Sequence, residues 1–300
     1  MCAAQIKTGG GSFDPKEPNI YFIASNTERL THAHMTHTHL LVAINELETA
    51  RDLDRVEAWI DEGKKIFIDS GVFNLAMTFA RKKTISMDEA LALAPGEMDG
   101  FEELFEKYVS IIRRFEGGIW GYIEIDQGGR ENKLKTRARI EALGLRPIPV
   151  YHPLNDGWDY FDTLAQQYDR LCFGNIVQAD AATRRRLLAT MWQRHVEYPD
   201  LWIHVLGLTA NEMAHMYPAN SCDSSSWMGG IRWDGFKERA MGQSLGVLPK
   251  NFQYVLGSDA TGDAGSQRAT RMCAYGAYML HRNWRNYIAD LRAEGIEVYE

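Results

Sequence analysis

Apolar and polar positions alternate along the chain in a repeating order: a short apolar run, a polar turn, and then a longer amphipathic stretch. Several of the short runs, such as residues 66–68, are apolar throughout rather than at every second position. Continuous runs of this kind are typical of parallel strands that are covered on both faces. We predict eight strands, at residues 20–25, 40–44, 65–68, 119–125, 147–151, 170–173, 201–206 and 219–222.

The stretches between these runs place apolar residues three and four positions apart, which predicts helices. One helix face is formed by Leu53, Val56, Trp59 and Ile60. Gly63 can end that helix. Further helices are predicted at residues 86–115, 131–143, 157–168 and 180–197. A long C-terminal helix is predicted over residues 267–291, with an apolar stripe of Met272, Tyr275, Met279, Tyr287 and Leu291.

Alternating strands and helices indicate an α/β fold. Eight strands before a closing helix favour a (β/α)8 TIM-type barrel that forms a single domain over residues 19–300. A doubly wound sheet is the alternative, although no Gly-rich phosphate loop follows the first predicted strand. Residues 1–18 are Gly-rich and polar, and we expect a flexible N-terminal arm there.

Composition narrows the class of protein further. No apolar stretch approaches the roughly 18 residues of a membrane span, and the first residues lack the apolar block of a signal peptide. The four cysteines are far apart and form no CxxC pair, which predicts reduced thiols and a cytoplasmic protein. The net charge of −7 means that any nucleic acid would be held by local basic patches.

In a TIM-type barrel the chemistry lies at the carboxyl ends of the strands. The residues that follow the predicted strands include three carboxylates, an imidazole and several glycines: Asp69, Asp126, His152, Gly174, Gly207 and Asp223. Carboxylates in one concave site can divide the roles of nucleophile and general acid or base. The alternative is that each aspartate only caps the helix that follows it.

These residues also carry a family resemblance. Residues 67–73, Phe-Ile-Asp-Ser-Gly-Val-Phe, resemble the D-S-G-x-[FY] segment of the tRNA-guanine transglycosylases. The chain is most similar to the phage and bacterial members that place 7-deazaguanines into DNA. The supporting strings follow in the family's order, at residues 122–126, 147–152, 173–175, 204–209 and 221–227.

The resemblance implies a base exchange and a role for each matching residue. Asp223 would be the nucleophile that attacks the sugar C1′ and displaces guanine, and Asp69 would be the general base. Phe73 would stack on the base, Asp126 would bind its edge, and Gly174 and Gly207 would allow close backbone contact. Further residues assigned to base binding are Ser70, Gly71, Asn175 and His204.

The chain departs from the family in one motif. The tRNA enzymes carry a C-x-C-x-x-C…H zinc site in their C-terminal part, whereas here Cys273 stands alone after Cys222. We therefore expect no cofactor, and we prefer DNA to tRNA as the polymer. A 7-deazaguanine is the expected second substrate, a partner subunit could add to the DNA grip, and the location would be the host cytoplasm if a phage encodes the chain.

Four histidines lie close together at His32, His34, His37 and His39. A His-x-His pair is the metal pair of amidohydrolase barrels, in which His152, His204 and Asp223 could be the later ligands. That pair should follow its strand, however, whereas these histidines precede the strand at 40–44 and should lie at the opposite end of the barrel. We therefore favour a polar loop and expect no metal.

Two arginine-rich segments are candidates for phosphate binding: Arg184, Arg185 and Arg186, and then Arg268, Arg271, Arg282 and Arg285. Tyr275, Tyr278, Trp284 and Tyr287 are interleaved with the second set. Arginines with aromatic residues can hold phosphates and an unstacked base. The alternatives are a solvated helix face for each segment, and, for the whole chain, a catalytically silent module that binds DNA or the base.

Overall fold

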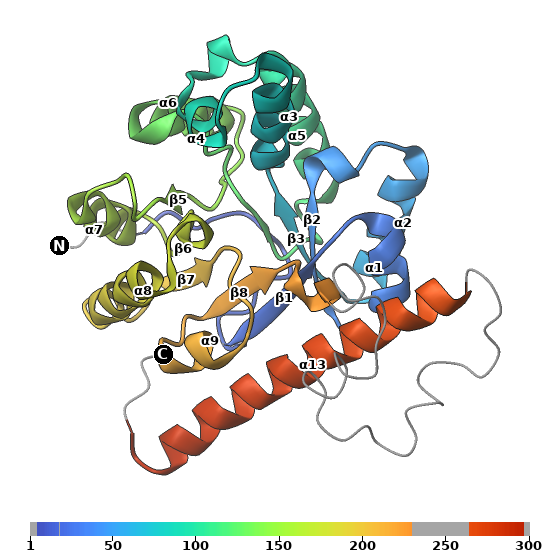
Figure 1. Cartoon of the computed structure of the whole chain (residues 1–300), viewed down its shortest axis with the longest axis vertical. Coiled ribbons are helices and arrows are strands. Elements are labelled where there is room, and N and C mark those ends of the chain that lie inside the picture. Colours follow the sequence, from blue (N-terminus) through green and yellow to red (C-terminus); the bar gives the residue numbers. More distant parts are fainter. Residues whose placement is uncertain (1–4, 18, 230–263, 297–300) are drawn as a thin grey trace.

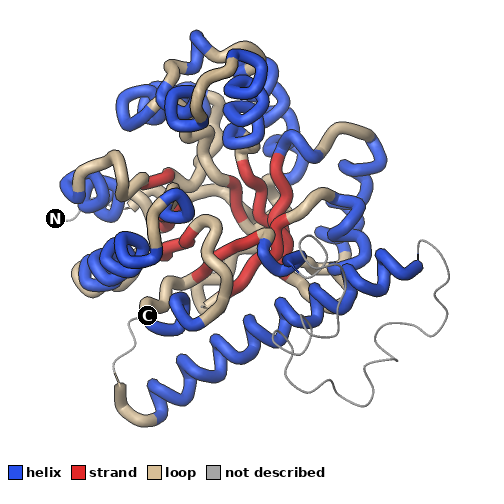
Figure 2. Tube along the Cα trace, in the orientation of Figure 1, coloured by secondary structure: helices blue, strands red, loops and turns tan. Residues whose placement is uncertain are grey.

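The computed structural model describes residues 5–17, 19–229 and 264–296. Its centre is one sheet of eight parallel strands, in the order β4-β3-β2-β1-β8-β7-β6-β5, surrounded by helices (Figure 2). The strands are β1 (Ile20–Ala24), β2 (His39–Ala43), β3 (Lys65–Asp69), β4 (Gly121–Tyr122), β5 (Val150–Tyr151), β6 (Arg170–Phe173), β7 (Trp202–Val205) and β8 (Ser221–Ser224). All eight predicted strands and the TIM-type fold are confirmed.

The ring of strands closes between β4 and β5 through a single parallel bridge, between Ile123 and Ile148. The amide of Ile148 donates to the carbonyl of Tyr122 at 2.9 Å. The carbonyl of Pro149 faces β6, where it accepts from the amide of Cys172 at 2.8 Å. The next amide on the β4 side, that of Val150, donates to the side-chain Oε1 of Glu124 at 2.6 Å instead of to a backbone carbonyl, so the backbone pairing of β4 with β5 ends there.

Helices follow the strands and form the outer layer (Figure 1). They are α1 (Thr27–Ala33), α2 (Ala50–Asp61), α3 (Val72–Lys83), α4 (Met87–Ala92), α5 (Phe101–Phe115), α6 (Gly129–Ala142), α7 (Trp158–Gln167), α8 (Ala181–His195), α9 (Glu212–Met216) and α13 (Ala264–Ala293). The helix expected over 86–115 is two helices, because Pro95 interrupts the pattern and Gly100, with a φ of 88°, precedes α5. None of the described helices is long and apolar enough to cross a membrane.

Two apolar cores position the strands. The larger one lies between the outer faces of the strands and the helices. The smaller one fills the barrel, with Phe22, Phe67, Trp120 and Trp202 among its residues. Ring contacts join these side chains; Phe67 and Trp120, for example, have centroids 4.8 Å apart. The interior is therefore packed with aromatic side chains, and polar groups collect at its two ends.

The long helix α13 lies alongside β1 and packs against α1 and α9 (Figure 1). Its buried stripe is Thr270, Ala274, Ala277, His281, Trp284 and Ile288. The predicted stripe is therefore wrong in phase: Met272 is buried, but Tyr287 is exposed. The small alanines allow close approach to the neighbouring elements, so the larger apolar residues that defined the predicted stripe turn partly outward.

The Gly-rich segment expected as a flexible arm over residues 1–18 is packed where the structure describes it. Ile6 forms a parallel bridge to the segment before β6, and Phe13 lies edge-on against Trp120 with the ring centroids 5.3 Å apart. Gly10 has a φ of 129°, and a Cβ atom there would lie 2.3 Å from the Trp120 carbonyl oxygen. Here glycine allows a close backbone approach rather than flexibility.

Arg170, the first residue of β6, holds this segment from inside the barrel. Its guanidinium donates to the Oγ1 of Thr8 at 2.5 Å and to three carbonyl oxygens, those of Thr8 at 2.9 Å, Gly9 at 2.5 Å and Trp120 at 2.8 Å. It also lies 4.1 Å from the centroid of the Phe13 ring. Burial lowers the pKa of Arg170 to about 10, so the side chain is a cation at neutral pH.

Candidate active site

Three carboxylates lie at the carboxyl-terminal rim of the barrel. Asp69 ends β3, Asp126 follows β4, and Asp223 lies in β8. Burial, with a smaller contribution from the negative charges of Asp126 and Asp223, raises the pKa of Asp69 to about 7 against the opposing hydrogen bonds from Gly71 and Ser70. The three side chains are therefore close enough for their charges to interact, as the sequence predicted.

None of these aspartates caps a helix through its side chain. The N-caps of α3 and α6 are Gly71 and Gly128, and that of the short 3-10 helix η4 (Ser226–Met228) is Ser225; none makes a side-chain capping bond. The capping alternative is thus excluded for all three carboxylates. Their side chains are available for another role.

Asp223 is held by two donors on the same oxygen. The Nε2 of His204 lies 3.2 Å from Oδ1, and the amide of Gly207 donates to Oδ1 at 3.1 Å. Gly207 has a φ of 73°, and a Cβ atom there would lie 2.5 Å from the Val177 side chain. Oδ2 is the oxygen that has no hydrogen-bond partner among the described residues.

A buried hydrogen-bond chain fixes the tautomer of His204. The indole N–H of Trp202 can only donate, and it donates to the Oγ of Ser221 at 2.9 Å. The Ser221 hydroxyl then donates to Nδ1 of His204 at 2.8 Å. With Nδ1 accepting, the neutral ring carries its hydrogen on Nε2 and donates it to Asp223. These hydrogen bonds, from Trp202 through Ser221 and His204, orient the carboxylate of Asp223.

Asp126 forms a second histidine–carboxylate pair, with His152. The Nε2 of His152 lies 2.8 Å from Oδ2 of Asp126. Although burial raises the pKa of Asp126, the hydrogen bond and charge of His152 lower it below its ordinary value overall. Gly174 leaves room for this pair, because a Cβ atom there would lie 3.1 Å from the His152 ring. A carboxylate beside an imidazole is suited to binding the polar edge of a base.

Two buried ion pairs hold the segments that carry Asp126 and His152. Arg137 of α6 binds both carboxylate oxygens of Glu124, at 2.6 and 3.0 Å. Lys133, also of α6, lies 2.7 Å from Asp156, which accepts the backbone amide of His152 at 2.9 Å. These pairs were not predicted, since Glu124, Lys133 and Asp156 resemble ordinary surface residues in the sequence.

The Asp69-Ser70-Gly71 turn places Asp69 through its own backbone. The amide of Gly71 donates to Oδ1 of Asp69 at 2.7 Å. Gly71 has a φ of 74°, and a Cβ atom there would lie 2.6 Å from the Oδ1 of Asn45. That Asn45 oxygen is buried and makes no hydrogen bond within the described chain. Asn45 is thus an unpredicted acceptor beside the rim; only its position after β2 could have indicated it.

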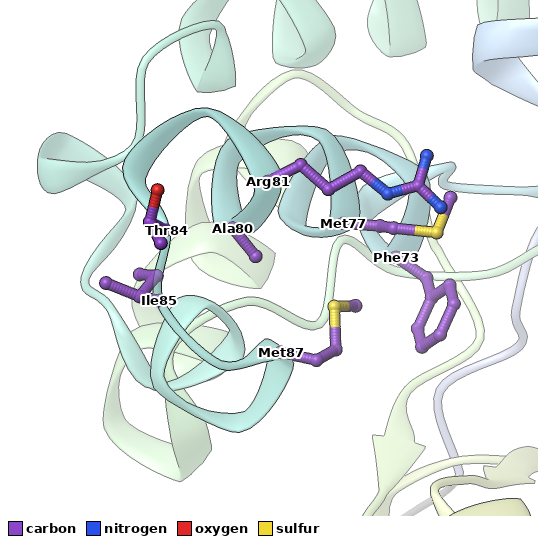
Figure 3. A pocket seen from close by; sticks show the side chains of 7 residues that line it. All are labelled: Phe73, Met77, Ala80, Arg81, Thr84, Ile85 and Met87. Atoms are coloured by element: carbon purple, nitrogen blue, oxygen red, sulfur yellow. The ribbon is translucent and has the colours of Figure 1, made fainter.

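Phe73 lies on the first turn of α3 with half of its surface exposed. It is one wall of a groove of about 510 Å³ between α3 and α4, where Figure 3 shows Phe73, Met77 and Met87 directed toward one another. The other lining residues are Ala80, Arg81, Thr84 and Ile85. An exposed ring four residues after Asp69 is consistent with a stacking role, and none of the three rim carboxylates lines this groove.

Asn175 and a group of hydroxyls complete the described rim. Asn175 has a φ of 48° and donates from Nδ2 to Asn155 at 2.6 Å, while its buried Oδ1 makes no hydrogen bond within the described chain. The hydroxyl of Ser224 donates to that of Ser226 at 2.6 Å, and Thr209 contacts both serines. These hydroxyls lie beside Asp223 and were not predicted.

The arginines proposed to bind phosphate are not equivalent. Arg184 donates to three backbone carbonyls near the N-terminus of α8, at 3.1 to 3.2 Å. Arg285 lies 3.8 Å from Glu17. Arg185, Arg186 and Arg282 are exposed, Arg271 is half-buried, and the Arg268 side chain lies outside the described residues. Trp284 is fully buried, so it cannot stack on a base.

The histidines required by the amidohydrolase alternative are divided between the two ends of the barrel. His152 and His204 lie at the rim, each paired with a different aspartate. His39 is the first residue of β2, at the opposite end, as its position in the sequence predicted. The described residues therefore do not assemble the metal cluster of that alternative at the rim.

Comparisons with known proteins identify neighbours of the fold. No family model matches the chain, and no curated protein matches it significantly. The native KDPGal structure aligns with a TM-score of 0.44 and 9% identity, over 89% of this chain and 96% of that one. The tryptophan synthase α subunit from Campylobacter jejuni gives 0.41 and 12%, over 71% and 88%.

The tryptophan synthase of M. tuberculosis, in its open form with BRD0059 bound, gives a TM-score of 0.44 and 11% identity, over 87% of this chain and 94% of that one. At such identities and TM-scores the likeness says nothing about what this chain does, since one barrel fold hosts many chemistries. The chemistry of this chain is indicated by the side chains at the carboxyl-terminal rim of its barrel.

Proposed function

We propose that the chain is a DNA-guanine transglycosylase, which exchanges guanine for a 7-deazaguanine through Asp223. The observation that carries this proposal is the state of the Asp223 carboxylate, which is bound on Oδ1 by His204 and Gly207 and has no hydrogen-bond partner on Oδ2 among the described residues. A nucleophilic carboxylate needs to be oriented in this way without being fully satisfied. The family resemblance of residues 67–73 and 221–227 supports the same reaction.

The proposed reaction has two displacements at one carbon. Oδ2 of Asp223 forms a bond to C1′ of the target nucleotide while the bond from C1′ to N9 of guanine breaks, and the electron pair leaves with guanine. N9 of the incoming 7-deazaguanine then attacks C1′ and releases the Asp223 carboxylate. Two inversions give net retention.

Asp69 would move the proton in both displacements. Its pKa of about 7 makes the acid and carboxylate forms similarly populated at neutral pH. The acid form can protonate the departing guanine, and the resulting carboxylate can take the proton from N9 of the incoming base. Phe73 would stack on the base, and Asp126, Gly174 and Asn175 would bind its edge.

DNA is proposed as the polymer because the resemblance is to the DNA-modifying relatives and because the cysteine zinc motif of the tRNA enzymes is absent. The exposed Arg185, Arg186 and Arg282 would contribute phosphate contacts. A 7-deazaguanine base is the proposed second substrate.

The test is incorporation of a labelled 7-deazaguanine into plasmid DNA, read as modified nucleosides by mass spectrometry after digestion. Asp223→Asn keeps an oxygen that can accept from Gly207 but loses the nucleophile, so incorporation should fall by more than about 10³-fold. Asp54→Asn, the same substitution at an exposed position of α2, is the matched control and should keep wild-type rates. Protein denatured during turnover should carry a sugar adduct on Asp223.

Two outcomes would contradict the proposal. Normal incorporation by the Asp223→Asn variant would show that Asp223 is not the nucleophile. Incorporation into tRNA but not into DNA, measured in a parallel reaction, would overturn the choice of polymer and leave the base exchange in place.

A further inference from the structure

Three buried histidines meet at the amino-terminal end of the barrel, away from the carboxylate rim. His37 and His39 come from the start of β2 and the residues before it, and His281 comes from the middle of α13. They are 1%, 4% and 5% exposed. Their ring centroids lie 5.1 to 6.1 Å apart. The segment His32–His39 is thus not the polar loop expected from sequence.

Nδ1 of His37 and Nε2 of His281 make no hydrogen bond within the described residues, and Nε2 of His39 faces only the carboxylate of Glu17, whose Oε1 lies 3.4 Å away. One nitrogen from each ring lies within 4.8 Å of the others. Buried polar atoms without partners destabilise a fold. One ligand that accepts a nitrogen lone pair from each of the three rings would satisfy them together.

The other nitrogens of two of these rings are engaged. Nε2 of His37 donates to the carbonyl of Tyr21 at 2.7 Å, which leaves the lone pair on Nδ1. Nδ1 of His39 lies 3.1 Å from the hydroxyl of Thr38. Metal-bound histidines are commonly oriented in this way by a hydrogen bond to the second nitrogen.

Burial disfavours the protonated form of all three rings. It lowers the pKa of His37 to about 3 and that of His281 well below its ordinary value, and it lowers the pKa of His39 although Glu17 opposes the shift. The neutral imidazole is the form of histidine that binds a metal.

We propose that His37, His39 and His281 bind a zinc ion, with Glu17 as the fourth ligand. Oε1 of Glu17 lies 3.4 Å from Nε2 of His39. Nitrogen and carboxylate oxygen are zinc ligands, and four of them complete a tetrahedral structural site. With zinc–nitrogen bonds of about 2.0–2.1 Å, the ligand nitrogens would lie roughly 3.4 Å apart, so the rings need only a small inward shift.

The site would fasten α13 to the barrel. Its ligands come from residue 17, from the start of β2 and from α13. Oε1 of Glu17 already lies 3.4 Å from His39 and 3.8 Å from Arg285 of α13, and the metal would bring the same three segments to one centre. It is separated from the rim by Phe22, whose ring centroid lies 5.5 Å from that of His39 and 5.9 Å from that of His204. The role is therefore structural, and the inference does not depend on the proposed base exchange.

The test is the metal content of the full chain purified without a histidine tag and measured by plasma mass spectrometry. The wild-type protein should hold one zinc per chain, and His37→Ala and His281→Ala should hold at least tenfold less. His32→Ala, in the same segment but outside the cluster, should keep wild-type content. Chelation should lower the melting temperature of the wild type and of His32→Ala, but not that of His281→Ala.

Cobalt substitution keeps the proposal testable if an alanine variant folds poorly. Co²⁺ added to the chelated wild-type protein should give the visible absorption of a tetrahedral site, and the folded His281→Gln variant should not. Less than a tenth of a zinc per chain together with no cobalt spectrum would overturn the proposal. Equal zinc in the wild type and in both histidine variants would also overturn it, whatever the outcome of the base-exchange assay.

Discussion

The Asp69 side chain combines a catalytic role with a cost in stability. Its pKa of about 7 has burial as its main cause, with the charges of Asp126 and Asp223 adding to it. Asp69 acts as an acid in the first displacement and as a base in the second, so the two half-reactions should depend on pH in opposite directions. The logarithm of kcat/KM for the incoming base should rise with a slope near one from about pH 5 to 7 and then level off, whereas that for DNA should be level below pH 7 and fall above it. A profile that is flat across this range would contradict Asp69 as the base.

The raised pKa of Asp69 also makes the stability of the fold depend on pH. This stability falls over the pH range in which Asp69 becomes available as a base. The carboxyl of the unfolded chain ionises near its ordinary value of 3.8, so the stability present below that pH is lost as the pH rises toward 7. Asp69→Asn removes this loss. The variant should be nearly inactive and yet more stable than the wild type at pH 8, and not at pH 3.5, in urea unfolding.

His204 is a positioning residue, because it acts on the substrate through Asp223. His204→Gln can still donate a hydrogen bond, but it breaks the chain from Trp202 through Ser221. We expect kcat to fall by about 10- to 100-fold with little change in KM, since the base contacts stay in place. His195→Gln, a buried histidine of α8, is the control for burial alone. A change confined to KM would contradict the positioning role.

The hydrogen bonds of Arg170 attach the N-terminal segment to the barrel. Arg170→Met would leave the carbonyls of Thr8, Gly9 and Trp120 without their shared donor. The free energy of unfolding should fall by about 3–5 kcal/mol, the usual effect of breaking a buried charged network. Urea unfolding measures this, with the exposed Arg185→Met as control. A loss below about 1 kcal/mol would show that the segment binds without the cation.

Elements with continuous apolar runs were predictable because a strand covered on both faces has to be apolar. The phase of α13 was not predictable, because Thr270, two alanines and His281 make up most of its buried stripe, while Tyr287 and other large residues of the predicted stripe face partly outward. Pro95 was a sequence signal for the break within residues 86–115. The helical spacing of apolar residues continues on both sides of it, however, and suggested one uninterrupted helix. Helix α3 escaped prediction because its start follows the Asp69 turn directly.

At the level of the whole molecule, strand order determines which distant residues meet. The carboxyl ends of parallel strands define one rim, so Asp69, Asp126 and Asp223 could be placed together before any coordinates. Their partners could not be placed, because the pairs His204–Asp223 and His152–Asp126 depend on side-chain direction and register. His281 illustrates the same limit: nothing in its local sequence connects it with a site more than 240 positions away.

The junction between β4 and β5 has the shortest backbone pairing in the described ring of strands. Backbone pairing there is limited to the bridge at Ile148, and the contact between Asp126 and His152 spans the same junction at the rim. Local opening costs least where few backbone hydrogen bonds have to break. A base bound by Asp126 would help to hold β4 and β5 together at the rim. Opening of the barrel at this junction and release of the base would then be coupled, so that each would favour the other.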